Sequence, residues 1–193
     1  MNPRSVLPVL LTLALALIAA CADTATDDLA GSSGPRDGYP PGPYGTTADT
    51  VIANLQFTTA EGDPLSFEDL YADGDNRLLL ISTAAGWCTS CREEQPKLQS
   101  LHAQHHARGL VVLLALFEDA AYAPATAAEA ARWKDRNSLT FDVVADEAFA
   151  LSAYYDPMST PMNMMVDVAS MKILWLTTGW DQTTIDAIIQ SRL

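Results

Sequence analysis

The sequence has few cysteines and little positive charge, and both shortages limit what the protein can do. Its 193 residues include three cysteines, and 11 Lys and Arg stand against 24 Asp and Glu, a formal net charge of −13. A surface of this sign repels nucleic acid and anionic lipid headgroups, so we expect neither as a partner. A structural zinc site needs four ligands, and the sequence holds a single closely spaced pair, Cys88 and Cys91. We therefore expect no metal site and no bound cofactor.

The N-terminal apolar run is too short for an ordinary transmembrane helix. Residues 6–20 are apolar except for Pro8 and Thr12, and Arg4 precedes them. A transmembrane helix needs about 20 apolar residues, whereas the apolar core of an export signal is shorter and follows a positive charge. Residues 1–20 are therefore predicted to be a signal peptide.

Cys21 stands directly after this run. The residues Ile18-Ala19-Ala20-Cys21 resemble a bacterial lipobox, in which cleavage leaves the cysteine as the new N-terminus and a lipid is attached to it. The resemblance implies a lipid-anchored protein of the bacterial cell envelope, extracytoplasmic or facing the periplasm. An ordinary signal peptide with an incidental cysteine is the alternative.

Residues 21–49 read as the lipidated cysteine and a flexible linker. This stretch is rich in Pro, Gly and Ser and has too few aliphatic residues to bury a core. Its Gly/Ser part is expected to be flexible and its Pro part stiffer, as a tether between membrane and domain requires. A proline-rich recognition motif is the competing interpretation.

Residues 50–193 are expected to form one α/β domain. The expected strands span residues 51–59, 77–83, 110–117, 141–144, 162–166 and 172–177. The expected helices span residues 66–71, 88–107, 126–136, 147–154 and 183–193. Residues 77–83 and 110–117 are apolar without alternation, which is typical of strands in a sheet covered on both faces. Ser66 is a candidate N-cap and Gly109 a candidate C-terminal cap.

Cys88 and Cys91 lie one helical turn apart where a buried strand gives way to a helix. Two thiols at this spacing close a disulfide reversibly. A helix N-terminus also stabilises the thiolate of the leading cysteine and lowers its pKa. This is the chemistry of thiol–disulfide exchange, although a structural disulfide or part of a zinc site could use the same pair.

Several motifs resemble the thioredoxin family, and in particular its exported, membrane-anchored members of the cytochrome c maturation and thiol-reductant type. Trp87 directly precedes the first cysteine, and Pro96 lies eight residues after it. Thr160-Pro161 precedes a strand where the family has a cis-proline. The resemblance covers about residues 49–193. It implies a thioredoxin-like fold, a central mixed sheet flanked by helices, with a subfamily insertion at about residues 124–150.

The resemblance also assigns roles to individual residues. Cys88 is implied as the nucleophile, partly exposed, and Cys91 as the more buried resolving thiol. Glu94 falls where membrane-anchored relatives carry an active-site glutamate, and it is implied in proton transfer. The residues implied in substrate binding are Trp87, Thr160 and Pro161.

The chain also departs from the family. Ser82 stands where thioredoxin has a buried Asp, and Thr89-Ser90 separates the two cysteines. These differences leave the redox direction open between reductase, oxidase and isomerase.

The leading hypothesis is a monomeric envelope oxidoreductase that reduces disulfides of exported proteins or cytochrome c apoproteins. Its partners would be protein thiols and disulfides, a membrane reductant as electron donor, and the membrane through the lipid. A peroxiredoxin-like peroxidase is one alternative, but Ala85 stands where that family has Thr. A copper metallochaperone is the other, but it uses a wider cysteine spacing and a distant His, and none follows His106.

Two further groups could suggest metal binding. His102, His105 and His106 share one helix face, and four methionines lie between residues 158 and 165. A solvated helix face and a methionine-rich core strand are the favoured interpretations.

Overall fold

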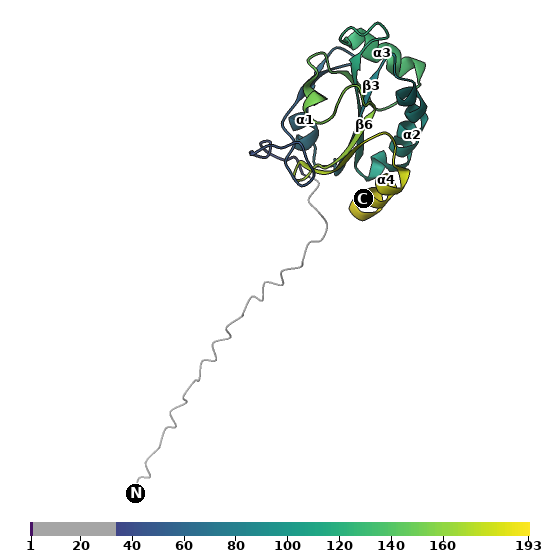
Figure 1. Ribbon diagram of the computed structural model, residues 1–193. Coiled ribbons are helices and arrows are strands. Elements are labelled where there is room, and N and C mark those ends of the chain that lie inside the picture. Colours follow the sequence, from purple (N-terminus) through teal and green to yellow (C-terminus); the bar gives the residue numbers. More distant parts are fainter. Residues whose placement is uncertain (2–33) are drawn as a thin grey trace. The chain divides into compact units, whose positions relative to one another are not determined.

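The computed structural model describes Met1 and residues 34–193 (Figure 1). The predicted signal peptide, the predicted lipidation site Cys21 and the first part of the expected linker lie outside the described residues. Among the residues that are described, no helix is both long and apolar enough to cross a membrane.

One mixed sheet forms the centre of the domain. Its seven strands lie in the order β2-β1-β5-β4-β3-β6-β7. Strand β4 runs parallel to β3 and β5, whereas β6 pairs antiparallel with both β3 and β7. The strands are β1 (Gln56–Thr59), β2 (Pro64–Ser66), β3 (Leu78–Ala85), β4 (Leu110–Glu118), β5 (Asp142–Ala145), β6 (Met162–Asp167) and β7 (Lys172–Thr178).

Helices cover both faces of this sheet (Figure 1). The helices are α1 (Phe67–Ala72), α2 (Thr89–His105), α3 (Ala127–Arg136) and α4 (Gln182–Arg192), with short 3₁₀ helices η1 (His106–Arg108) and η2 (Ala150–Ala153). Leu78 and Leu80 of β3 belong to a core with α2, α3 and α4, whereas Leu79 and Ile81 belong to a second core with α1 and η2. Every residue of β3 is buried, which confirms the prediction from its unbroken apolar run.

The predicted helix ends are confirmed at two places. Ser66 caps α1 through a capping box, in which its hydroxyl accepts from the backbone N–H of Asp69 and the Asp69 carboxylate accepts from the backbone N–H of Ser66. Gly109 ends η1 in the left-handed conformation, with φ of 97°. Pro96 lies inside α2 as expected.

The expected insertion is part of the sheet itself. Residues 124–150 contain α3 and β5, and β5 lies between β1 and β4. The segment therefore adds a strand on the side of β4 that faces away from β3, the strand that leads to the cysteines.

Two predicted elements are shorter in the structure. The expected strand 51–59 begins only at Gln56, because Val51 makes isolated bridges with Tyr44 and Lys172 instead of joining β1. The expected helix 147–154 is reduced to η2. Phe149, with a left-handed φ of 53°, breaks the preceding turn. The short strand β2 was not expected, and it pairs with β1 across the predicted turn.

The folded unit begins earlier than the expected boundary at residue 50. The Arg36 guanidinium donates hydrogen bonds to four backbone carbonyl oxygens, those of Tyr71, Asp73, Gly74 and Asn76. Tyr39 packs edge-on against Tyr71 at 5.8 Å, and its hydroxyl donates to the carbonyl of Ile52. The segment is poor in aliphatic residues, but its arginine and tyrosine side chains supply the contacts that hold it on the domain.

Candidate functional site

A disulfide joins Cys88 and Cys91 at the junction of β3 and α2. Their Cα atoms are 5.4 Å apart. Cys88 is the N-cap of α2, and its Sγ accepts a hydrogen bond from the backbone N–H of Cys91 at 3.0 Å. When the bond is reduced, this N–H and the positive end of the helix dipole favour the thiolate of Cys88 over that of Cys91.

Both cysteines are more buried than a freely accessible dithiol. Cys88 is 3% exposed and Cys91 is 1% exposed, so the partial exposure expected for Cys88 is not present in this oxidised state. Both belong to the core that β3 forms with α2, α3 and α4, and Thr160 lies against both sulfurs. Its carbonyl oxygen is 3.9 Å from Cys88 Sγ, and its Oγ1 is 3.9 Å from Cys91 Sγ.

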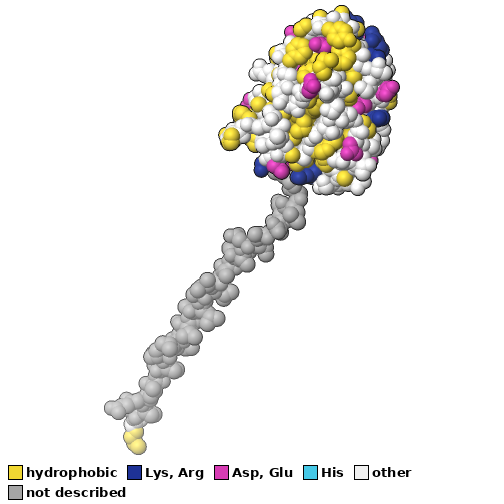
Figure 2. All heavy atoms as spheres, viewed as in Figure 1, with side chains coloured by type: hydrophobic (Ala, Val, Ile, Leu, Met, Phe, Trp, Pro, Cys, Tyr) yellow, Lys and Arg dark blue, Asp and Glu magenta, His cyan; other side chains and the backbone are white. Residues whose placement is uncertain are grey.

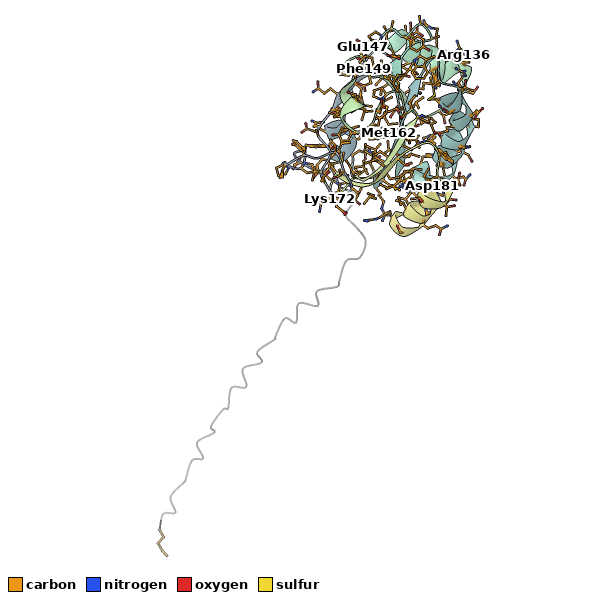
Figure 3. All side chains as sticks on the ribbon, in the orientation of Figure 1. Arg136, Glu147, Phe149, Met162, Lys172 and Asp181 are labelled. Carbon is orange, nitrogen blue, oxygen red and sulfur yellow. A yellow bond between two sulfur atoms is a disulfide. The ribbon has the colours of Figure 1, made fainter. Side chains whose placement is uncertain are left out.

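The Thr160–Pro161 peptide bond is cis, as predicted. Thr83, near the end of β3, ties this segment to the strand that leads to the cysteines. Its Oγ1 lies 3.2 Å from Thr160 Oγ1 and accepts from the backbone N–H of Met162 at 2.8 Å. Met162 begins β6 and is fully buried in the interior (Figure 3). Thr83 is not among the site residues predicted from the sequence. The one indication there is that it is a polar residue at the end of an apolar strand.

Glu94 is buried one turn after Cys91 in α2. Its side chain is 4% exposed, and its Oε2 accepts a hydrogen bond from Asn163 Nδ2 at 2.9 Å. Burial raises the pKa of Glu94 above its ordinary value, while the Asn163 hydrogen bond and the nearby Lys97 charge oppose that rise. The neighbouring Glu93 is exposed. The two adjacent glutamates therefore differ in their surroundings: Glu94 is buried and Glu93 is in solvent.

Asn163 was missed at the sequence level. It lies in β6 two residues after Pro161, is fully buried, and also donates to the carbonyl of Gly179 at 3.0 Å. Within the described residues its Oδ1 has no hydrogen-bond partner. The sequence does contain an indication of its role: Asn163 is a lone amide among the apolar residues of a predicted buried strand, and a buried polar group needs a hydrogen-bond partner.

Trp87 is fixed on three sides. Its indole N–H donates to Glu118 Oε2 at 2.7 Å. Tyr122 stacks on the indole at 5.4 Å with an interplanar angle of 20°, and Phe117 packs edge-on at 6.3 Å. The resemblance implies Trp87 in substrate binding, and one face of its indole is covered by Tyr122 of the same chain. Glu118 and Tyr122 were not expected at the site.

The histidines lie at the end of α2 and in η1, and three of the four methionines lie in β6. His102 and His106 stack at 4.9 Å, and burial lowers the pKa of His102. Met162, Met164 and Met165 are fully buried, whereas Met158 is 79% exposed. Across Met1 and residues 34–193, no three His, Cys, Asp or Glu side chains cluster in a way that could hold a metal ion.

The parallel β3–β4 pair, the Cys-x-x-Cys disulfide at the start of α2 and the cis-proline against it define a thioredoxin-like protein. Residues 48–173 match the model of the AhpC/TSA family. The chain belongs to the AhpC/TSA family. Among curated proteins, no sequence matches this chain.

Solved structures show the same fold. A thiol:disulfide interchange protein of the thioredoxin family from Chlorobium tepidum is 17% identical, with a TM-score of 0.59 over 76% of this chain and 98% of its own. The thioredoxin domain of a thiol-disulfide oxidoreductase from Bacteroides vulgatus is 14% identical, with a TM-score of 0.59 over 75% and 99%. A secreted Mycobacterium tuberculosis disulfide oxidoreductase homologous to E. coli DsbE is 14% identical, with a TM-score of 0.53 over 72% and 96%.

Proposed function

We propose that this chain is a thiol–disulfide oxidoreductase of the cell envelope that reduces disulfides in exported proteins or cytochrome c apoproteins. The observation that carries the proposal is the Cys88–Cys91 disulfide at the N-terminus of α2, where the Cys91 N–H donates to Cys88 Sγ. This geometry stabilises one thiolate of the pair selectively, which a purely structural disulfide does not require.

The reaction begins from the reduced dithiol. The Cys88 thiolate attacks one sulfur of the substrate disulfide, forms a mixed disulfide and releases the first substrate thiolate. The Cys91 thiolate then attacks Cys88 Sγ, which re-forms the intramolecular disulfide and releases the second substrate thiolate. Two electrons pass from the chain to the substrate, and a dithiol reductant must restore the Cys88–Cys91 pair.

Glu94 is the proposed proton acceptor for Cys91 during the second step. Glu94 is buried within α2, and burial raises its pKa, so it titrates at higher pH than an exposed glutamate. Trp87, Thr160 and Pro161 are the proposed substrate-binding residues. The Thr160 carbonyl, 3.9 Å from Cys88 Sγ, is placed to accept a hydrogen bond from an extended substrate segment.

The proposed location follows from the N-terminal sequence. A lipid on Cys21 would hold the monomer at the membrane, where a membrane reductant could supply electrons. Mass spectrometry of the N-terminal peptide from expressed protein tests this, because a processed lipoprotein begins at Cys21 and carries a diacylglyceryl mass on the Cys21 sulfur. An unmodified Cys21, or cleavage at another residue, would remove the anchor from the proposal.

The deciding experiment is the reduction potential of Cys88–Cys91 in dithiothreitol and glutathione buffers. A value near the roughly −270 mV of thioredoxin supports a reductase, whereas a value near the roughly −120 mV of strong oxidants indicates a disulfide donor. Absence of any reversible two-electron couple rejects the proposal. Peroxide consumption that depends on Cys88 would favour the peroxidase alternative, and stoichiometric Cu(I) binding would favour the metallochaperone.

A further inference from the structure

The loop after β4 is a rigid protrusion beside the disulfide. Asp119 Oδ1 accepts hydrogen bonds from the backbone N–H groups of Ala121 and Ala123, at 2.7 and 2.9 Å. The Asp119 N–H donates to the carbonyl of Ala123 at 2.8 Å, and an isolated bridge joins Glu118 to Pro124. The bridge at the base of the loop and the Asp119 carboxylate together hold the loop backbone in one conformation.

Tyr122, in this loop, combines an uncommon backbone conformation with an exposed side chain. Its φ is 63°, in the left-handed region, and its side chain is 65% exposed. A bulky residue is rarely found there, and such outliers concentrate at functional sites. Phe149 also has a left-handed backbone, and both rings reach one aromatic cluster. We define that cluster by Trp87, Phe117, Tyr122, Phe149 and Tyr155.

The loop packs directly against the residues that lead into the disulfide. The Gly86 N–H donates to the Glu118 carbonyl at 2.8 Å. A Cβ on Gly86 would lie only 2.4 Å from the backbone nitrogen of Ala120, so no larger residue fits there without moving the loop. Tyr122 stacks on Trp87, which directly precedes Cys88. The position of Tyr122 relative to the reactive sulfur is therefore set by backbone contacts as well as by ring stacking.

A partner that approaches Trp87 from this side meets Tyr122 first. Figure 2 shows hydrophobic side chains gathered at the end of the domain where Figure 3 labels Phe149, a member of the aromatic cluster. Within the described residues Tyr122 is 65% exposed, so the side of its ring that faces away from Trp87 is open to a partner. An exposed aromatic ring with a fixed backbone contributes contact area at little entropic cost on binding.

We propose that Tyr122 is a specificity residue: its exposed ring, stacked on Trp87, contacts an apolar side chain next to the disulfide of a polypeptide substrate. This inference rests on the proposed oxidoreductase function. A polypeptide extends several residues to each side of its cysteine and can reach the ring, whereas a small-molecule disulfide offers little beyond its sulfurs. Tyr122 therefore favours protein disulfides over small ones.

The test compares Tyr122→Asn with Tyr122→Phe in the purified full chain, using insulin as the protein disulfide and oxidised glutathione as the small one. Asn tolerates the left-handed backbone, so the loop should keep its conformation when the ring is removed. We expect Tyr122→Asn to lower kcat/KM for insulin about tenfold, as loss of an aromatic contact at the centre of an interface does. Its kcat/KM for oxidised glutathione should stay within about twofold of wild type, as for an ordinary surface substitution.

Tyr122→Phe keeps the stacked ring and should retain the wild-type preference. Tyr44→Asn is the matched control, because Tyr44 is also an exposed tyrosine, 50% accessible. Its backbone bridges to Val51, and Val51 bridges to Lys172 at the start of β7, so it belongs to another part of the domain. If Tyr122→Asn changes neither rate, or lowers both equally, Tyr122 is not a specificity residue, and the oxidoreductase function stands. If the wild type reduces neither substrate, the oxidoreductase function itself fails.

Discussion

The side-chain amide of Asn163 donates a hydrogen bond to the carboxylate of Glu94 across 2.9 Å, joining β6 to the helix that carries both cysteines. Both residues are buried, at 0% and 4% exposure. Burial penalises the charged form of Glu94 and raises its pKa, while the Asn163 hydrogen bond favours the charged form. The titration of Glu94 therefore depends on a residue from another element.

Replacing Glu94 tests its proposed role in proton transfer. We expect Glu94→Gln to slow the resolving step by about a hundredfold, within the usual contribution of a general base. Glu93→Gln is the control, since Glu93 is the adjacent but exposed glutamate. Stopped-flow measurement of mixed-disulfide decay gives both rates, and equal rates in the two variants would remove Glu94 from the mechanism.

Replacing Asn163 should shift the pH profile of exchange. Asn163→Leu removes the hydrogen bond that lowers the Glu94 pKa, so the rise of rate with pH should move to higher pH. The variant should also lose about 1–3 kcal/mol of stability, because the Gly179 carbonyl loses a donor. The position of the profile, unlike the stability, reports on the groups that titrate during exchange, which are Glu94 and the two thiols. A profile at the wild-type pH would show that the hydrogen bond does not tune Glu94, and in a Glu94→Gln background the Asn163→Leu shift should disappear.

Glu94 should also make the stability of the oxidised protein depend on pH. Its folded-state pKa lies above the ordinary value of 4.5, so the folded protein binds more protons between the two values than the unfolded chain does. The free energy of unfolding therefore falls as pH rises from about 4.5 through the folded-state pKa. Urea unfolding of wild type and Glu94→Gln across this window measures the difference. A gap between the two proteins that is constant with pH, or that widens in favour of the wild type, contradicts the expected sign.

The Trp87–Glu118 hydrogen bond should contribute to stability near the site. Glu118→Ala leaves the indole N–H without its 2.7 Å acceptor, and we expect a loss of about 1 kcal/mol. For a domain of this size that corresponds to about 2–4 °C in melting temperature. Glu118→Gln keeps an acceptor and should lose less. Equal losses in the two variants would mean that the hydrogen bond is not the cause.

Arg36 should stabilise the domain although it lies in the expected linker. Arg36→Ala removes the hydrogen bonds to four carbonyl oxygens and should cost about 1–2 kcal/mol. Arg108→Ala is the control, since Arg108 is exposed and, among the described residues, reaches only His105 Nδ1 at 3.4 Å. Denaturant unfolding measures both. An Arg36→Ala variant as stable as the control would return residues 34–49 to the linker.

Local signals predicted most of the fold. The unbroken apolar runs of β3 and β4 marked them as interior strands, and Ser66 and Gly109 marked helix ends. These features depend on residues close in sequence, so they are visible without the fold. The expected helix at 147–154 is wrong because the Asp146 carboxylate accepts hydrogen bonds from the backbone N–H groups of Ala150 and Leu151, and Phe149, just before them, has a left-handed backbone. Helical periodicity does not report such side-chain hydrogen bonds.

The linker prediction failed at its second half for a related reason. Composition showed few aliphatic residues between 34 and 49, and it predicted that the segment could not bury a core. The segment is instead held by the Arg36 guanidinium on carbonyl oxygens and by the Tyr39 ring on Tyr71. Composition counts residue types and does not show which acceptors the rest of the fold leaves free.

The sequence by itself determined the reactive pair. Cys88 and Cys91 are three residues apart at the start of a helix, so their disulfide and the N-terminal hydrogen bond follow from local geometry. Only the tertiary structure decided which residues surround them. Asn163 reaches Glu94 across 69 positions, and Glu118 reaches Trp87 across 31. These contacts exist because β6 pairs with β3, and the β4 end packs on Gly86, which are long-range arrangements that no local pattern encodes.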